Sequence, residues 1–346
     1  MTGNFSRLGG IVEPLLRWYD VCARPLPWRE SPTPYGVLVS EIMLQQTRVE
    51  AVRERYVLFL RELPDLQALA AVPEERLLKL WEGLGYYSRA RNLKRCAERI
   101  VSEHGGTVPR DPAVLRTLPG IGDYCAGSIA SIAYGVKAPA VDGNVLRVIS
   151  RLAASDGDIS LPAVKKELTG RVRELLPERR CGDFNQALMD LGATVCLPNG
   201  APLCEECPLR ALCEGYARGT AADLPVRTKK PPRRKEAVGV LLLRRKDCLA
   251  LRRRPAKGLL AGLWELPTFS GSAEAFLAQN GVACTPPVPA GKATHIFTHV
   301  EWRMTAYAAE SADAGLPQGW VWAAPEDMEA VYALPSAFSA FLPHRK

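Results

Sequence analysis

The chain has 346 residues, 47% of them hydrophobic and 24% charged, and its formal net charge is +8. These values are typical of a soluble globular protein with room for two domains, and the positive charge is compatible with a polyanionic partner. No run reaches the ~18 to 20 apolar residues of a membrane span, and the first ten residues lack the apolar core of a signal peptide, so we expect a cytoplasmic protein with no membrane partner.

Helical periodicity and capping residues dominate the first part of the chain, which predicts an all-α domain over residues 1–222. The segment 24–29 is expected to be a rigid loop because it contains two prolines, and Pro34 is expected to lie in the first turn of the next helix. Further helices are expected at residues 49–62, 74–81, 88–104, 111–117, 123–134, 143–153, 162–176 and 183–195.

The helix expected near residues 35–48 carries an isolated acidic side chain. Between Tyr35 and Leu44 the only polar side chains are Ser40 and Glu41, and a helix that is apolar on nearly every side should be buried. Burial disfavours the ionised carboxylate and raises its pKa, which keeps a general acid protonated near neutral pH. Glu41 is therefore a candidate general acid. The alternative is a structural glutamate that pairs with an arginine or caps the backbone.

Residues 81–93 combine glycines, adjacent tyrosines and the two arginines Arg89 and Arg91. Paired aromatic residues often belong to a core. Beside arginines they can also stack on bases or enter a duplex, so both interpretations stay open for this segment.

Two turns between helices hold further candidates. Leu118-Pro-Gly-Ile-Gly122 can expose backbone N–H groups to a phosphate at the start of the next helix, although any helix corner can contain such a sequence. Asp142 directly precedes another helix, where aspartate is most often an N-cap. A carboxylate fixed by helix N–H groups should have a low pKa and stay ionised. A protonated Glu41 and an ionised Asp142 would form the pair that glycosidic cleavage needs.

Four of the ten cysteines lie within eighteen residues, with the spacing C-x7-C-x2-C-x5-C. Four thiolates in one short loop can bind a [4Fe–4S] cluster, whereas zinc sites usually join two separated cysteine pairs. The cluster is the favoured interpretation and structural zinc the alternative. The candidate ligands are Cys196, Cys204, Cys207 and Cys213.

Residues 223–236 are rich in proline and basic side chains and have no apolar period, which predicts a linker. Beyond it, over residues 237–346, the pattern changes to short alternating or apolar runs and predicts an α+β domain. Strands are expected at residues 237–243, 249–253, 293–297, 302–308 and 319–322, and helices near 272–279 and 325–331.

Taken together, these sequence motifs resemble those of the MutY-type adenine DNA glycosylases of the endonuclease III superfamily. The resemblance runs from about residue 11 to 214 and continues more weakly beyond the linker. The segments that carry it are Pro27–Arg29, Ser40–Thr47, Gly83–Tyr87 with Arg89–Asn92, Leu118–Gly122, Val141–Asn144, Phe184–Gln186 with Asp190–Gly192, and the four cysteines.

The resemblance implies an all-α helix-hairpin-helix domain with a [4Fe–4S] cluster loop, followed by an α+β Nudix-like domain. It also implies removal of adenine mispaired with 8-oxoguanine or G in double-stranded DNA by base flipping, in a protein expected to be a monomer. Tyr124 stands where bifunctional relatives carry a Schiff-base lysine, so the enzyme is expected to be monofunctional.

The resemblance assigns roles to individual positions. Glu41 is expected to protonate adenine at N7 and then to handle the attacking water, and Asp142 to stabilise the oxocarbenium-like sugar, with Tyr124 and Asn144 in support. The other positions expected to contact DNA or the lesion are Leu26, Trp28, Arg29 and Gln186 in the adenine pocket, the inserted Gln46 and Tyr86, and Thr47, Gly83, Leu84, Arg89, Leu118, Gly120, Gly122, Phe297, Thr298 and His299.

The sequence departs from the family pattern at three places. Seven residues, instead of the usual six, separate Cys196 from Cys204, and a turn at residues 198–200 is expected to absorb the extra one. Thr298 stands where the family commonly has serine, which keeps the hydroxyl; a plain strand end is the alternative for this segment. Residues 272–281 lack the paired glutamates that hold Mg²⁺ in a Nudix hydrolase, so this domain should bind rather than catalyse.

Three other functions compete with this interpretation. A bifunctional glycosylase for oxidised pyrimidines is disfavoured by Tyr124. A non-catalytic lesion-binding protein is disfavoured by the retention of both Glu41 and Asp142. A nucleotide hydrolase centred on the second domain is disfavoured by the missing glutamates.

Overall fold

The computed structural model describes residues 3–228 and 231–342, and the chain forms two compact units. The first unit comprises residues 1–71 and 92–229, and the second comprises residues 72–91 and 230–346. Residues 229–230 belong to the expected linker and, like residues 1–2 and 343–346, lie outside the described residues. Within the described ranges, no helix is both long and apolar enough to cross a membrane.

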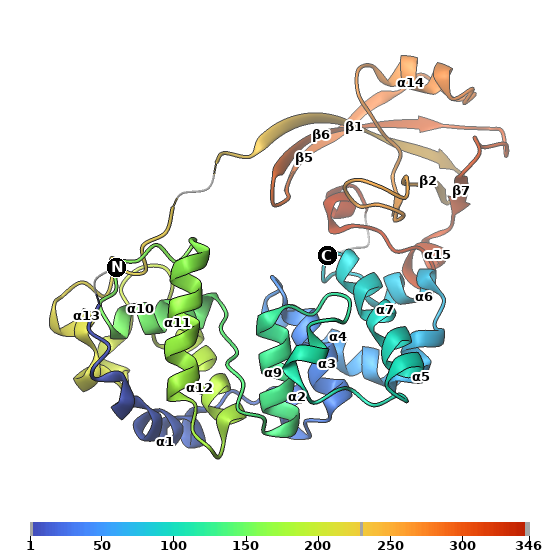
Figure 1. The fold of residues 1–346 in the computed structure, drawn as a ribbon. Coiled ribbons are helices and arrows are strands. Elements are labelled where there is room, and N and C mark those ends of the chain that lie inside the picture. The colour runs from blue at the N-terminus through green and yellow to red at the C-terminus, as the bar shows by residue number, and fades with distance from the viewer. Residues whose placement is uncertain (1–2, 229–230, 343–346) are drawn as a thin grey trace. The chain divides into compact units, whose positions relative to one another are not determined.

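The first unit is built from helices, as the periodicity predicts (Figure 1). The first turn of α7 belongs to the second unit. In chain order the elements are η1 (Leu8–Ile11), α1 (Val12–Cys22), α2 (Pro27–Glu30), α3 (Pro34–Leu44), α4 (Val49–Glu62), α5 (Leu66–Ala71), α7 (Ser88–Glu103), α8 (Pro112–Leu115), α9 (Asp123–Tyr134), α10 (Gly143–Leu152), α11 (Pro162–Leu175), α12 (Cys181–Thr194), η2 (Cys204–Glu206), η3 (Arg210–Leu212) and α13 (Glu214–Ala217).

Several short helices of this unit were not predicted, among them α2 and α5. The expected loop at 24–29 contains the four-residue helix α2, in which Pro27 occupies the first turn. The six-residue helix α5 lies where no element was expected. Both are too short to display a 3.6-residue period in the sequence.

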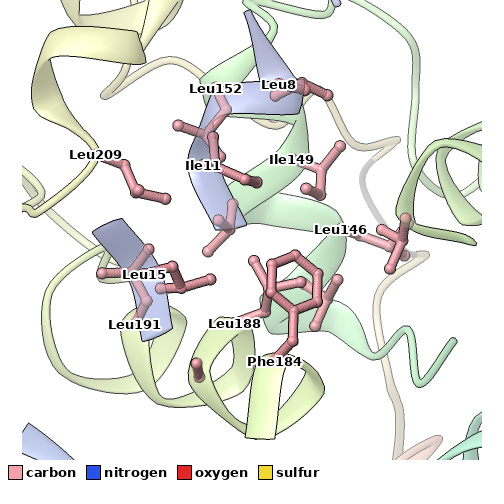
Figure 2. Close-up of a cluster of buried hydrophobic side chains, with 14 of the residues drawn as sticks. Leu8, Ile11, Leu15, Leu146, Ile149, Leu152, Phe184, Leu188, Leu191 and Leu209 are labelled. Atoms are coloured by element: carbon pink, nitrogen blue, oxygen red, sulfur yellow. The ribbon is translucent and has the colours of Figure 1, made fainter. Parts of the chain in front are cut away.

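A buried apolar cluster joins α1, α10, α11 and α12 (Figure 2). Phe184 and Leu188 of α12 contribute fully buried side chains, and Leu15 of α1 and Ile149 of α10 meet them from the neighbouring helices. Helix α12 also packs against α9, so it connects α9 to α10.

Two glycines let α12 approach these neighbours closely. A Cβ atom on Gly182 would lie 2.6 Å from the backbone oxygen of Ser131 in α9, and one on Gly192 would lie 2.7 Å from Cβ of Asn144 in α10. Any larger side chain would push the helices apart. The glycines therefore fix the spacing between α9 and the N-terminus of α10, where the candidate site lies.

The second unit contains a mixed sheet with helices at its margins, and its α+β class is confirmed. Within residues 231–342, seven strands are arranged in the order β3-β2-β1-β6-β5, with β4 paired to β1 and β7 paired to β2. The long strands β1 and β6 are parallel, and the other pairs are antiparallel. The elements are α6 (Glu74–Leu80), β1 (Arg234–Arg245), β2 (Cys248–Arg253), β3 (Trp264–Glu265), β4 (Thr268–Phe269), α14 (Ala273–Gln279), β5 (Val288–Ile296), β6 (Val300–Glu310), β7 (Trp320–Ala323), α15 (Pro325–Ala330) and η4 (Ser336–Phe341).

The strands differ from the predicted ranges mainly at their ends. Strand β1 begins at Arg234, inside the basic segment expected to be linker, because backbone pairing to β6 holds even its exposed, charged residues in the sheet. The two-residue strands β3 and β4 and the helix η4 were not predicted. Such short elements are set by pairing and packing that their own sequence does not encode.

Candidate active site

Glu41 lies in the middle of a buried helix. Thr33 caps α3 by accepting a hydrogen bond from the Gly36 N–H at 3.0 Å, and Pro34 occupies the first turn. Residues 36–43 are all buried, and Glu41 is 5% exposed. Burial raises the pKa of the Glu41 carboxyl, in the direction that the apolar sequence predicts.

The Glu41 carboxyl faces two hydroxyl groups of α9. Tyr124 and Ser128 lie one turn apart on α9, which packs against α3, and both hydroxyls act to lower the pKa that burial raises. Glu41 Oε2 and Ser128 Oγ nevertheless have no hydrogen-bond partner at normal geometry among the described residues. The hydroxyls therefore act as nearby dipoles, and burial determines the direction of the shift. Burial also raises the pKa of Tyr124, which stays a neutral hydroxyl.

Asp142 caps α10 with both carboxylate oxygens. Oδ1 accepts the Val145 N–H at 2.8 Å, and Oδ2 accepts Nδ2 of Asn144 at 2.8 Å. The expectation of a low pKa was wrong: burial raises the pKa of Asp142, although these hydrogen bonds and Arg147 oppose the shift. The charge of Asp142 raises the pKa of Glu41, whereas the hydrogen bonds from the Val145 N–H and Asn144 lower the pKa of Asp142. These influences favour ionisation of Asp142 before Glu41.

A cavity beside α2, α3, α9 and α12 brings all four expected base-pocket residues together. Its lining includes Leu26, Trp28, Arg29 and Gln186, as well as Glu41 and Tyr124. Asp142 is outside this lining, but its charge raises the pKa of Glu41, so it lies within electrostatic reach of it. The lining contains no lysine. Its remaining side chains, which were not predicted, are Arg24, Val37, Ser40, Leu44, Val49, Ile132 and Met189.

Asp190 holds one wall of this cavity in place. Its fully buried carboxylate accepts hydrogen bonds from Nη1 and Nη2 of Arg29 at 2.7 and 3.0 Å, and from Nε of Arg24 at 2.8 Å. Burial disfavours the charged forms, but the pairing outweighs it, so the pKa of Asp190 is lowered and that of Arg29 is raised. The sequence signal for this clamp was an aspartate placed between the apolar residues Leu188 and Leu191.

Arg147 connects the Asp142 site to the cysteine loop. Its Nη2 donates to Oδ1 of Asn144 at 2.9 Å and to the Gly192 carbonyl at 2.7 Å, and its Nε donates to the Cys196 carbonyl at 2.8 Å. Asn144, the expected supporting residue, thus lies between Asp142 and this arginine. Arg147 was not predicted as a site residue, because arginine side chains on a helix are mostly exposed to solvent.

The four clustered cysteines line one cavity between α10, α12 and the loop that follows α12. The lining includes Cys196, Cys204, Cys207 and Cys213, as well as Arg151, whose Nη1 donates to Cys196 Sγ at 3.3 Å. Among the described residues, no three metal-binding side chains converge closely enough for a single ion. The chain bends at residues 198–201, where Gly200 has a positive φ of 76°. The Leu203 N–H then donates a hydrogen bond to the Val195 carbonyl.

The glycine-rich turn between α8 and α9 lies next to the end of α3. Leu118 is buried, whereas Gly120 and Gly122 are exposed, and Gly120 has a φ of 80° that favours glycine. Nε2 of Gln45, the residue before Gln46, lies 3.4 Å from the Gly120 carbonyl. The expected phosphate-binding turn and the end of the Glu41 helix are therefore neighbours.

The two residues expected to enter the duplex both have strained backbone conformations. Gln46 in the first unit has a φ of 57°, and Tyr86 in the second has a φ of 45°. Non-glycine residues at positive φ are uncommon and concentrate at functional sites. Both side chains are exposed, and Thr47 beside Gln46 is partly buried.

Three other residues expected to contact DNA surround Tyr86. Gly83 is exposed with a φ of 91°, whereas Leu84 and Arg89 are 4% and 7% exposed. Leu84 and Arg89 therefore present little surface to a ligand in this structure. A direct contact between Arg89 and DNA is not supported by this burial.

The expected lesion-reading segment forms the turn between β5 and β6. Phe297 is anchored by the ring of Trp302, 5.0 Å away between centroids, while Thr298 and His299 are exposed. The hydroxyls of Thr298 and Tyr86 lie 2.8 Å apart and form a hydrogen bond within the second unit.

The second unit holds no obvious Mg²⁺ site in its described part. Glu265 has a fully buried side chain that pairs with Arg252 at 2.6 Å and Arg254 at 2.5 Å. Helix α14, which follows it, contains the single acidic residue Glu274. A carboxylate held by two arginines is not available to a divalent cation.

Comparisons with known proteins match both units. Residues 39–174 match the HhH-GPD superfamily of base excision DNA repair proteins, and residues 239–344 match the NUDIX domain. The adenine DNA glycosylase of Homo sapiens is 34% identical over 382 aligned residues, which cover 90% of this chain and 70% of the relative. That of Mycolicibacterium smegmatis is 42% identical over 212 residues, covering 60% of this chain and 71% of the relative.

Among solved structures, a thermostable thymine-DNA glycosylase matches 61% of this chain and 97% of its own, with a TM-score of 0.55 and 30% identity. The predicted helix-hairpin-helix and Nudix-like folds are thereby confirmed. Identity of 34% over 90% of this chain and 70% of the Homo sapiens relative, together with a desolvated carboxyl in a pocket and a second one within electrostatic reach of it, shows that the chain belongs to the adenine DNA glycosylases of base excision repair.

Proposed function

We propose that this enzyme removes adenine mispaired with 8-oxoguanine or G in double-stranded DNA, as a DNA-associated, cytoplasmic, monomeric and monofunctional glycosylase. The observation that carries the chemistry is a pair of carboxyls with raised pKa values: Glu41, which lines the pocket, and Asp142, which lies within electrostatic reach of Glu41. Their unequal hydrogen bonding assigns them different protonation states, which acid-assisted glycosidic cleavage requires.

The reaction begins with adenine flipped out of the duplex into the pocket lined by Leu26, Trp28, Arg29 and Gln186. Glu41 donates its proton to N7 of the base. The C1′–N9 bond then breaks and its electron pair leaves with adenine, so positive charge develops on the sugar. The Asp142 carboxylate stabilises that charge.

Water then completes the hydrolysis. It attacks C1′ of the cationic sugar, and the Glu41 carboxylate, now ionised, accepts the proton that water releases. The products are free adenine and an abasic site, and Glu41 is protonated again. Tyr124 and Asn144 support the carboxyls, Tyr124 as a neutral dipole near Glu41 and Asn144 as a donor to Asp142.

Recognition of the opposite base is assigned to the exposed turn 297–299, and distortion of the duplex to Gln46 and Tyr86. The strained backbone at both inserted residues and the exposure of their side chains support this assignment. The turn at 118–122 would hold a phosphate through backbone N–H groups without reading sequence.

The cysteine loop is proposed to hold a [4Fe–4S] cluster. The four thiols line one cavity and come from one short loop, which fits a [4Fe–4S] cluster better than zinc, whose sites usually join two separated cysteine pairs. The hydrogen bonds of Arg151 and of the Tyr216 N–H to the sulfurs of Cys196 and Cys213 are typical of such sites. The cluster would order the loop; glycosidic hydrolysis has no redox step.

The test is excision from duplexes that carry adenine opposite 8-oxoguanine, opposite G and opposite T. We expect abasic sites in the first two and almost none in the third. No excision from any duplex would contradict the proposal, as would equal excision from all three.

Two controls assign the chemistry. Glu41→Gln should lose about 10²- to 10⁴-fold in the single-turnover rate, the usual contribution of a general acid, while still binding the mispair. Borohydride should trap no protein–DNA adduct with the wild-type enzyme, since the pocket lining contains no lysine. A trapped adduct would show bifunctional chemistry instead.

A further inference from the structure

The guanidinium of Arg89 is enclosed by the segment that presents Tyr86. One of its terminal nitrogens donates to the carbonyls of Leu84 at 2.8 Å and Gly85 at 3.1 Å. The same group lies 5.5 Å from the ring centroids of both Trp81 and Tyr86. Burial lowers the pKa of Arg89 to about 10, which still leaves it charged at neutral pH.

Tyr86 is constrained at three points by this arrangement. Its carbonyl accepts the backbone N–H of Arg89 at 2.8 Å, its ring lies beside the Arg89 guanidinium, and its hydroxyl bonds Thr298 at 2.8 Å. The backbone at Tyr86 has a positive φ of 45°, a strained conformation for a non-glycine residue that persists only where the surroundings enforce it. Two of the three constraints come from Arg89.

A phosphate contact is a poor explanation for an arginine in this position. Arg89 is 7% exposed, whereas a side chain that contacts a phosphate must be accessible; Arg95 on the same helix is exposed. A planar guanidinium can face two rings and bond two carbonyls at once, and a lysine ammonium cannot reproduce that geometry.

We propose that Arg89 is a positioning residue: it holds Tyr86 in the strained conformation in which the tyrosine hydroxyl meets Thr298, and so links duplex insertion to lesion reading. This proposal rests on the proposed function, in which Tyr86 enters the duplex and the turn 297–299 reads the base opposite adenine. Arg89 then contributes to specificity without touching DNA.

The experiment compares Arg89→Lys with Arg95→Lys, because lysine keeps the charge in both variants. Affinities are measured over a range of salt concentrations for an undamaged duplex and for a duplex with uncleavable 2′-fluoroadenine opposite 8-oxoguanine, together with single-turnover excision. Arg89→Lys should lose at least tenfold in its preference for the lesion duplex and excise more slowly. Its affinity for undamaged DNA and its salt dependence should not change. Arg95→Lys should match the wild type.

A Tyr86→Ala background removes the residue through which Arg89 is proposed to act. Adding Arg89→Lys to it should change nothing further, and an additive loss would overturn the proposal. Wild-type lesion preference in Arg89→Lys would overturn it as well. Near-ultraviolet circular dichroism checks that the variants fold, and the double variant remains informative if the single one is destabilised.

This result is separable from the proposed function. If the wild-type enzyme does not excise adenine opposite 8-oxoguanine, the proposed function fails. If the wild type excises it and Arg89→Lys retains the preference, only the positioning role fails.

Discussion

At the scale of single residues, the proposed chemistry depends on two carboxyls with different surroundings. Glu41 is buried in an apolar helix with one oxygen that accepts no hydrogen bond among the described residues, whereas Asp142 accepts a helix N–H and an amide. Burial raises both pKa values, so the pH dependence of activity should be bell-shaped and displaced upward from that of exposed carboxyls. It should fall at low pH as Asp142 gains a proton and at high pH as Glu41 loses one.

The raised pKa of Glu41 also predicts how stability depends on pH. The folded protein retains this proton over a pH range in which the unfolded chain, whose glutamate pKa is ~4.3, has lost it. Stability from this carboxyl therefore falls as pH rises from the unfolded pKa toward the folded one. Glu41→Gln cannot ionise, so its free energy of unfolding should match that of the wild type near pH 4 and exceed it increasingly toward neutral pH. The difference should grow by about 1.4 kcal/mol for every pH unit between the unfolded and the folded pKa.

Thermal unfolding at four pH values between 4 and 8 tests this expectation. Glu50→Gln is the matched control, because its carboxyl lies in water and the variant should follow the wild type throughout. A Glu41→Gln variant that is less stable than the wild type at neutral pH would identify Glu41 as an ionised, structural carboxylate.

The individual residues of the site can be predicted from the sequence more readily than the contacts between them. An acidic residue in an apolar helix revealed the burial of Glu41, and this pattern is local. The pKa of Asp142 was predicted in the wrong direction, because its hydrogen bonds can be read from a helix start but its burial depends on residues far along the chain. The Arg24–Asp190–Arg29 clamp was missed for the same reason: its partners are more than 160 residues apart.

At the scale of elements, the long amphipathic helices were predicted to within one or two residues. Helices α4 and α9 have the predicted bounds, because the local sequence determines both their periodicity and their ends. The short elements α2, β3 and η4 were missed because packing against other segments determines them. The spacing of α9, α12 and α10 depends on Gly182 and Gly192, and no sequence pattern identified those contacts.

The cysteine loop is an element with almost no core of its own. Between Cys196 and Cys213, Leu209 is the one side chain that this described stretch buries. Order in such a loop must come from the site that its four thiols surround. We therefore predict that the purified protein contains about four iron atoms per chain with a broad visible absorbance, as expected for a [4Fe–4S] cluster.

Cys207→Ser should remove the iron and make residues 197–212 sensitive to limited proteolysis. Cys248→Ser is the matched control, because Cys248 lies in β2 and should be neutral toward both measurements. One zinc atom per chain, or a loop that stays protected without metal, would contradict the cluster assignment.

At the scale of the whole molecule, residues 72–91 are the segment whose compact unit is hardest to predict from the sequence. They have the helical pattern of the first domain, yet they form part of the second compact unit. Nζ of Lys79 donates to the carbonyls of Met328 and Tyr332 at 2.9 and 3.2 Å, and Glu82 accepts the Leu334 N–H at 2.7 Å. These partners lie about 250 residues away along the chain. The helical periodicity of residues 72–91 therefore cannot indicate these contacts.

This assignment predicts which parts of the protein open together. Phe338 is fully buried in the core of the second unit, and Phe338→Ala should remove about 3 to 5 kcal/mol of its stability. Segments that unfold as one unit share the same opening free energy in native-state hydrogen exchange. Exchange of residues 77–81 should therefore accelerate together with β1 in this variant, while α12 stays protected.

Leu188→Ala, in the core of the first unit, should accelerate hydrogen exchange in α12 and leave exchange of residues 77–81 unchanged. If residues 77–81 instead followed α12 in both variants, the segment that presents Tyr86 would belong energetically to the helical unit, and its hydrogen bond to Thr298 would not reflect a shared folding unit.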